Sequence, residues 1–387
     1  MKKTLIALAA LAATGAFAQS SVTIYGTIDA ALFYQSADGG LSRTKVDASG
    51  MNTSKFGFTG VEDIGGGMKG LFKLEGGANP DTGTGTASNT NNQQSGVGVV
   101  PGATTAGATS VGGTQGFTFN RYAYVGVSGG FGEIHIGREY TGTFITGAAT
   151  DPFALAGPAN QLILTQNIGI SKAQATYTSA SNMLTYKTPV MSGFGAVLQV
   201  WQGETASSAA NAGAGDGNSV SASYAGGPLY LQAGQQTTKG TVAAASATAL
   251  ATYGDYTMSD VTGTYDFGVV KLVGYYGKEE LVGVSGTAKA TNTSNLVGVI
   301  VPVGAWNIKV DYIRAAYNTG AAGAVDNVGT QVALGADYAL SKRTTVYGTW
   351  ASVTQDTGAN FSAGNGALSA VNGNSSQAAA IGLRHTF

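Results

Sequence analysis

The sequence contains no cysteine, few prolines and few charged side chains. Proline occurs 7 times in 387 residues, and Asp, Glu, Lys and Arg together make up 11%. Without cysteine the chain has neither disulfides nor thiolate metal ligands. The low charge argues against a disordered chain, and the scarce proline argues against a collagen-like one. The chain has instead 60 glycines, 18 tyrosines and 14 phenylalanines, which is typical of many strands joined by glycine-rich turns.

Long hydrophobic runs are also missing after Leu11, so no later segment predicts a membrane-spanning helix. The start, MKKTLIALAALAATGAFA, has two lysines, a short apolar run and an A-x-A site at 16–18. This pattern predicts a cleaved secretory signal peptide at 1–18 and a mature chain of 19–387 that forms one domain. Twenty Lys and Arg face 21 Asp and Glu, so the charge favours no nucleic-acid partner.

The remaining chain alternates with a period of two. In VTIYGTIDAAL (22–32) one face is apolar or glycine and the other carries Thr, Tyr and Asp. In 55–75 the charged residues similarly alternate with aromatic ones. Repeated alternating segments of about ten residues are the signature of a membrane barrel. The fold class predicted is therefore all-β, a transmembrane antiparallel β-barrel.

The connections between the expected strands fall into two classes by length. Seven short turns are expected at 62–67, 128–131, 189–193, 225–228, 266–268, 302–304 and 340–343. Longer loops are expected at 78–116, 141–178, 203–217, 238–254, 280–290, 318–327 and 356–374. Bacterial outer-membrane barrels have short periplasmic turns and long external loops, with an even number of strands. The spacing predicts about sixteen strands.

The carboxyl end is itself patterned. QAAAIGLRHTF alternates small or apolar residues up to Phe387, with no polar tail. Because backbone groups in hydrocarbon must all be paired, the last strand, 376–387, is expected to pair with the first and close the barrel. The terminal Phe387 also resembles the signature that the barrel-assembly machinery is thought to read.

Five blocks along the mature chain carry a family resemblance: SSVTIYGTIDAAL, SKFGFTGVEDIGGGMKGLFKLE, FNRYAYVGVSGGFGEIHIGREY, DYALSKRTTVYG and IGLRHTF. In this order they resemble the general porins of β-proteobacteria such as Burkholderia, Bordetella and Comamonas relatives. The resemblance implies a homotrimer of sixteen-stranded barrels in the Gram-negative outer membrane, in contact with its lipid and lipopolysaccharide. It also implies a third external loop, 141–178, folded into the lumen and carrying Asp151-Pro152-Phe153. No cofactor is implied.

Candidate pore residues follow from the lumen phase of the strands. The cations are Lys55, Lys73 and Arg121, which are expected to face Asp151 on the inward loop. The nearby carboxylates are Glu75 and Glu133. Opposed charges across a constriction would select solutes by size and charge, with a mild preference for anions. Arg138 has the parity of the isoleucines before it and predicts a rim position, a bulge or the end of the strand. Lys187, Lys271 and Lys309 are further candidates for the far wall.

Seven aromatic residues invite two interpretations, a sugar-binding track or an interfacial girdle. They are Tyr122, Tyr124, Tyr275, Tyr276, Trp306, Tyr312 and Trp350. The girdle is favoured because aromatic belts are expected of any such barrel.

The function predicted is a general diffusion porin, which passes small hydrophilic solutes and ions through a water-filled channel. An enzyme is disfavoured because the only imidazoles, His135 and His385, accompany no catalytic motif and no metal cluster is visible. The alternative is an outer-membrane barrel that acts as a surface binding protein or adhesin through its long loops.

Overall fold

The computed structural model describes residues 21–86, 117–165, 175–203, 213, 215–239, 242–246, 249–252, 254–282, 288–364, 368 and 372–387. The expected signal peptide, 1–18, lies outside these residues. No helix within the described ranges is long and apolar enough to cross a membrane.

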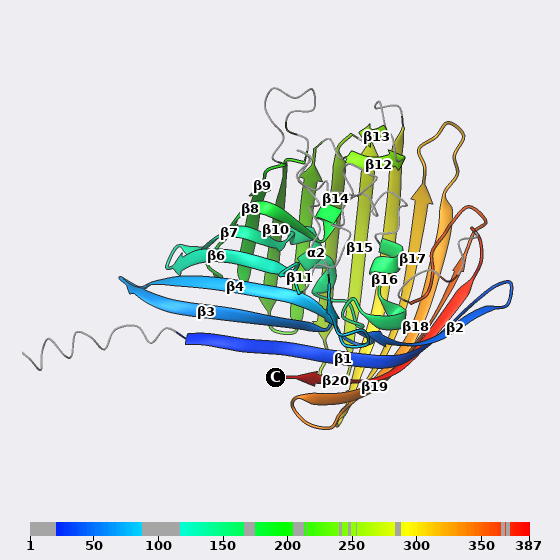
Figure 1. The fold of residues 1–387 in the computed structure, drawn as a ribbon, viewed down its shortest axis with the longest axis horizontal. Helices are drawn as coiled ribbons and strands as arrows, with labels where there is room; N and C mark the ends of the chain where they lie inside the picture. Colours follow the sequence, from blue (N-terminus) through cyan, green and yellow to red (C-terminus); the bar gives the residue numbers. More distant parts are fainter. Residues whose placement is uncertain are drawn as a thin grey trace, which may run out of the picture.

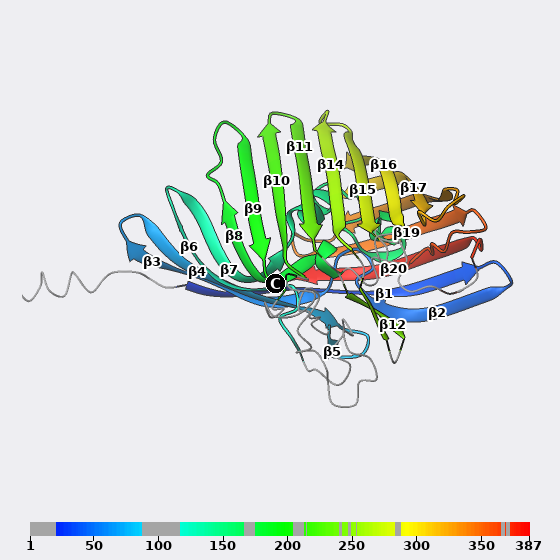
Figure 2. The same ribbon diagram turned by 90° about the horizontal axis from the view of Figure 1, so that it is seen from above.

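The structure is a closed antiparallel β-barrel (Figures 1 and 2). Its strands, in chain order, are β1 (Ser21–Ala37), β2 (Leu41–Ala48), β3 (Lys55–Gly65), β4 (Met68–Asn79), β6 (Tyr122–Gly129), β7 (Gly132–Tyr140), β8 (Ser179–Lys187), β9 (Phe194–Trp201), β10 (Gly217–Gly226), β11 (Leu229–Thr238), β14 (Tyr256–Asp266), β15 (Lys271–Val282), β16 (Lys289–Val303), β17 (Trp306–Asn318), β18 (Asn327–Ala339), β19 (Thr344–Gln355) and β20 (Ser376–Thr386). Outside this wall, β5 (Thr84–Gly85) pairs antiparallel with the end of β4, and β12 (Val242–Ser246) pairs with β13 (Ala249–Thr252) in a separate two-stranded sheet.

The strands β2 and β3 share one position beside β1, so the barrel wall is sixteen-stranded, as predicted. The half of β1 from Ala30 to Ala37 pairs with β2, and the half from Ser21 to Thr27 pairs with β3. The break between them is organised by Asp29, whose carboxylate accepts backbone N–H bonds from residues 50, 51 and 52 at 2.7–3.1 Å. The β1–β2 hairpin was not expected from the sequence. The hydrogen bonds of Asp29 hold the backbone of residues 50–52 at the point where the partner of β1 changes from β2 to β3.

The seven short turns fall where the sequence predicts them, between β3 and β4, β6 and β7, β8 and β9, β10 and β11, β14 and β15, β16 and β17, and β18 and β19. The connection expected at 280–290 is shorter, because β15 continues to Val282 and β16 begins at Lys289.

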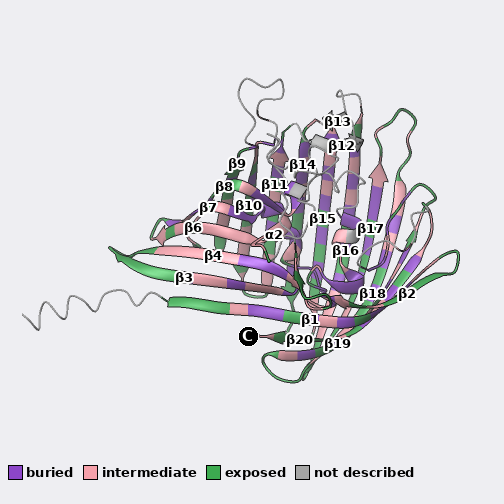
Figure 3. Ribbon diagram, viewed as in Figure 1, coloured by how far each residue is buried: buried purple, intermediate pink, exposed green. Residues whose placement is uncertain are grey.

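Burial is reversed relative to a water-soluble barrel (Figure 3). Large apolar side chains such as Ile24, Leu32 and Ile381 are exposed on the outer face. Polar side chains such as Gln199, Gln236 and Asn292 are buried inside. An apolar outer band around a polar interior is the arrangement that a bilayer requires of a barrel.

The barrel closes between β20 and β1, as the alternating carboxyl end predicts. The register runs from Thr27 opposite Thr386 to Ala37 opposite Ser376. One step beyond, Gly26 and Phe387 exchange both backbone hydrogen bonds at 3.1 Å. A Cβ on Gly26 would lie 2.4 Å from Cζ of the Phe387 ring and 2.9 Å from the carbonyl oxygen of Lys55. The glycine therefore provides the space in which the terminal ring lies.

We expect Gly26→Val to reduce the yield of folded barrel, because the new side chain displaces Phe387 from the closing strand pair. Overpacking of this kind typically costs about 1–3 kcal/mol. Yield is measured as the fraction that keeps the compact, heat-modifiable form on gels after refolding. Gly274→Val is the matched control, since Gly274 is on an outer-facing position of β15 and a Cβ added there would have no neighbouring atom within 4 Å. Equal yields from the two variants would contradict this role of Gly26.

Candidate functional site: the lumen and its inward loop

A loop crosses the interior of the barrel. It follows β7 and contains α2 (Gly142–Ala148), η1 (Gly157–Ala159), α3 (Leu162–Thr165) and η2 (Ala175–Tyr177). The first helix contacts β9, β10, β11 and β14, α3 contacts β16, β17 and β18, and η1 contacts β18, β19 and β20. Figures 1 and 2 show these short helices enclosed by the strands. The described parts of the connection 141–178 therefore fold inward, as the family resemblance implies.

The start of the loop is held by two glutamines of the wall. Gln199 on β9 accepts the backbone N–H of Gly142 at 2.8 Å and donates to the carbonyl of Tyr140 at 2.8 Å. Gln236 on β11 accepts the hydroxyl of Thr143 and donates to the carbonyl of Thr176 at 3.0 Å. Gln199 bonds to the residues at the entry of the loop, and Gln236 bonds to both of its arms. The two glutamines therefore fix the position of α2.

The tip of the loop fits into notches that glycines leave in the wall. A Cβ on Gly298 of β16 would lie 2.7 Å from Pro152, and one on Gly335 of β18 would lie 2.6 Å from the ring of Phe153. Phe153 is only 4% exposed and packs with alanines 159, 333 and 351. The side chains of the tip are therefore held against the wall, away from the centre of the channel.

Asp151 forms the turn at this tip. Its carboxylate accepts the backbone N–H groups of Phe153 and Leu155, each at 2.9 Å. Residues Ala154 and Leu155 both have left-handed φ angles, of 55° and 56°. Such conformations are unfavourable for side chains with a Cβ, so the carboxylate compensates a strained turn. Burial raises the pKa of Asp151 to about 6.

The position of Asp151 corrects one expectation from the sequence. The residue was expected to face Lys55, Lys73 and Arg121 across the constriction, but it is 9% exposed and bonded to its own loop. It interacts electrostatically with Lys309 and Asp311 of β17. A carboxylate that closes a turn cannot also present its oxygens to passing solutes.

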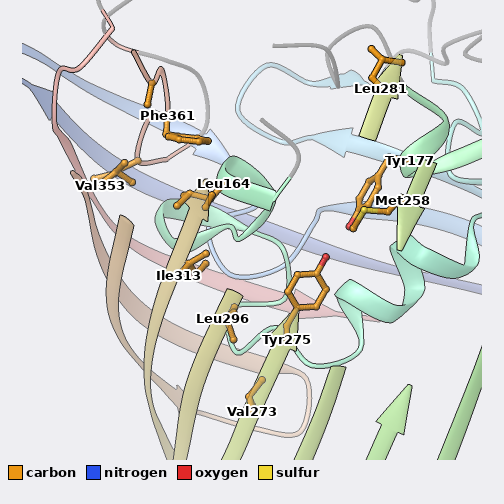
Figure 4. Packing of buried hydrophobic residues seen from close by; sticks show 14 of the residues in the cluster. Leu164, Tyr177, Met258, Val273, Tyr275, Leu281, Leu296, Ile313, Val353 and Phe361 are labelled. Atoms are coloured by element: carbon orange, nitrogen blue, oxygen red, sulfur yellow. The ribbon is translucent and has the colours of Figure 1, made fainter. Parts of the chain in front are cut away.

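The end of the loop packs in an apolar cluster against β14 to β17 (Figure 4). Leu164 and Tyr177 come from the loop, and Met258, Tyr275 and Leu296 come from the wall. Asn292 of β16 donates to the carbonyls of Leu164 and Thr165 at 3.0 and 3.2 Å. The described parts of the loop are thus attached at both ends and at the tip.

The opposite side of the lumen carries five cations, which we call the basic wall: Lys55 on β3, Lys73 on β4, Arg121 before β6, Arg138 on β7 and Lys187 on β8. Three of them reach carboxylates: Arg121 and Lys73 lie 2.6 and 3.7 Å from Glu75, and Lys187 lies 2.6 Å from Glu139. The side chain of Lys55 forms no ion pair or hydrogen bond with another described residue. The wall also carries Glu133, so its three carboxylates, on Glu75, Glu133 and Glu139, are fewer than its five cations. The basic wall is therefore net positive.

Sequence reasoning brought together Lys55, Lys73, Arg121 and Glu75, and the structure places these four in one group. It also places Glu133 3.2 Å from His135, nearer to the short-turn end of the barrel. Sequence reasoning missed Glu139, although it has the same parity along β7 as Glu133 and His135. The register does shift between Gly137 and Glu139, which is the bulge predicted as one of three explanations for Arg138.

Arg138 uses this bulge to reach the neighbouring strand and loop. Its guanidinium donates to the carbonyl of Asn120 at 2.6 Å and to the hydroxyls of Ser179 and Ser181 at 2.8 Å. These bonds connect the entry of β6 with the start of β8. Arg138 therefore contributes charge to the wall while its donors are occupied by the protein.

The aromatic residues divide into two groups. Tyr276, Trp306, Tyr312 and Trp350 are exposed on the outer face, as a girdle requires. Tyr122 and Tyr124 instead share the lumen phase with Lys73 and Glu75, which pair with them in register, and Tyr275 is buried under the inward loop. The girdle interpretation is therefore wrong for these three, because alternation along β6 and β15 points them inside.

About half-way round the barrel from the basic wall, the lumen side is acidic. Asp260 on β14, Glu279 on β15, Asp311 on β17 and Asp337 on β18 are all buried. Lys309 forms an ion pair of 2.6 Å with Asp337. The inward loop packs over this acidic side, so the basic wall borders the open part of the lumen.

Residues 4–358 match the family model of Gram-negative porins. The chain belongs to the Gram-negative porin family. It is 32% identical over 395 residues, 100% of each chain, to outer membrane porin protein 32 of Delftia acidovorans. It is 29% identical over 413 residues, again 100% of each chain, to the major outer membrane protein P.IB of Neisseria gonorrhoeae.

Solved structures agree with this membership. The anion-selective porin from Comamonas acidovorans matches with a TM-score of 0.74 and 26% identity, over 95% of this chain and 100% of that one. The trimer form of OmpT from Vibrio cholerae, at a TM-score of 0.64 and 16% identity, shares the fold. This protein is a porin of the Gram-negative outer membrane, and its family and fold are those of a diffusion channel.

Proposed function

We propose that this general diffusion porin has a mild preference for anions, and that Lys55, Lys73 and Arg121 set that preference. The observation that carries the proposal is the excess of cations over carboxylates on the basic wall, while the acidic side chains of the other wall are buried. Fixed charge of one sign along a narrow water path raises the local concentration of the opposite ion. Solutes move passively, and the mechanism requires no cofactor.

We further propose that the protein is a homotrimer, exported with a signal peptide at 1–18 that is removed to leave residues 19–387. A groove of about 640 Å³ on the outer face offers a contact for a second copy. Small residues, Ala336, Gly348 and Ala379, lie between the larger Leu334 and Trp350 there. The remainder of the apolar band would contact outer-membrane lipid and lipopolysaccharide. Phe387, in the strand that closes the barrel, would be read by the barrel-assembly machinery.

Single-channel recording of the refolded protein in a planar bilayer tests the channel and its selectivity together. We expect stepwise openings in groups of three with ohmic current, and a reversal potential in a KCl gradient whose sign indicates chloride preference. Openings that occur singly would reject the trimer, and a reversal potential on the cation side would reject the selectivity. Silence from a correctly folded protein would reject the channel and favour a binding role for the long loops.

A further inference from the structure

The ring of Tyr124, on the lumen side of β6, points to a class of solute that the channel could bind. Its ring is stacked on His135, with centroids 4.2 Å apart and an angle of 9° between the planes. His135 is 2% exposed, whereas Tyr124 is partly exposed on the lumen side of β6. The imidazole covers one face of the tyrosine ring, which leaves the other face as the one on which a solute can stack. The partly exposed Tyr124 borders the lumen.

Cations lie on the nearby strands β4 and β3. Lys73 is opposite Tyr124 in the register of β4 and β6, and its Nζ lies 3.8 Å from the ring centroid of Tyr122. Its nearest carboxylate oxygen, on Glu75, is 3.7 Å away, while Arg121 lies at 2.6 Å from that residue. Glu75 is thus neutralised mainly by Arg121, which leaves the charge of Lys73 incompletely compensated. Lys55, without an ion-pair partner among the described residues, adds a second ammonium to the same group.

We infer that this part of the basic wall is a subsite for planar aromatic carboxylates, and the inference rests on the proposed anion preference. The ring of such a solute stacks on the face of Tyr124 that His135 does not cover, and its carboxylate meets Lys73 and Lys55. A small inorganic anion uses only the charges, whereas an aromatic carboxylate gains the ring contact in addition. Aromatic contacts of this kind raise residence by about threefold to tenfold.

The experiment compares benzoate with cyclohexanecarboxylate, which has the same charge and nearly the same size but no planar ring. Each is added in the millimolar range to a single wild-type channel in KCl, with acetate as the reference anion. We expect benzoate to reduce the chloride current, or to lengthen its interruptions, about threefold more than cyclohexanecarboxylate. Equal effects of the two acids would overturn the inference.

Three variants locate the effect. Tyr124→Leu should abolish the difference between the two acids, and Tyr124→Phe should retain it, because the ring face and not the hydroxyl is used. Tyr276→Leu, on the outer face of β15, is the matched control and should behave as wild type. Persistence of the difference in Tyr124→Leu would also overturn the inference. A channel that conducts KCl but does not distinguish the acids disproves only the subsite, whereas absence of KCl current disproves the proposed function itself.

Discussion

Gly335→Val is expected to lower the single-channel conductance and to make the open-channel current noisier. The valine Cβ would occupy the place of the Phe153 ring, which lies 2.6 Å from that point. The ring can move only away from β18, towards the lumen, because the wall is behind it. Overpacking at a buried contact typically costs about 1–3 kcal/mol, so the loop tip would populate displaced positions. The measurement is the amplitude and variance of single-channel steps in KCl.

Two comparisons make this result specific. Gly274→Val places the same side chain on the outer face of β15, where a Cβ would have no neighbouring atom within 4 Å, and should conduct as wild type. Adding Phe153→Ala to Gly335→Val removes the clashing ring, so the double variant should be quieter than Gly335→Val alone. An unchanged current in Gly335→Val would show that the notch does not position the loop.

The sequence was sufficient to predict the barrel because alternation, turn chemistry and loop lengths are local. The seven short turns and the pairing of β20 with β1 were located from these patterns. The β1–β2 hairpin was not, because its register depends on Asp29 reaching the backbone of residues 50–52, a contact across more than twenty positions. Local patterns indicate where strands lie, and long-range side-chain bonds decide where one strand is interrupted.

The site was predicted in part for a similar reason. Lys55, Lys73 and Glu75 came from strand parity, which the structure respects, whereas Arg121 reaches Glu75 from the bend before β6, where the alternation of the strand does not apply. Notch glycines such as Gly335 could not be recognised in a chain with 60 glycines, because their role depends on the loop that packs on them. The role of Asp151 was misjudged on the same grounds, since only the fold shows that its two oxygens are occupied.

Replacing Lys55, Lys73 and Arg121 together with glutamine is expected to move the reversal potential in a KCl gradient from the anion side to the cation side. The change removes three positive charges from the basic wall and leaves Glu75 without its partners at 2.6 and 3.7 Å. Two unit charges about 4 Å apart interact by about 1 kcal/mol in water and more near protein. The summed change is therefore sufficient for about a tenfold change in the anion-to-cation permeability ratio.

The control removes equal charge from outside the lumen. Lys278 and Lys289 both pair with Glu280 at one end of β15 and β16, and Lys342 is in an exposed turn. Their triple replacement with glutamine should leave the reversal potential unchanged at 0.1 M salt, where charges beyond about 10 Å are screened. An equal shift in both triple variants would mean that the net charge of the protein, and not the basic wall, sets the selectivity.

The triple variant could also change the current by losing the barrel fold, because the three substitutions leave the buried carboxylate of Glu75 without an ion-pair partner. Adding Glu75→Gln removes that carboxylate and restores a neutral, hydrogen-bonding side chain at the same position. The quadruple variant still loses two net positive charges, so its reversal potential should remain displaced towards cations, by less than in the triple variant. A return to the wild-type value would assign the whole shift to Glu75 and reject Lys55, Lys73 and Arg121 as the selectivity determinant.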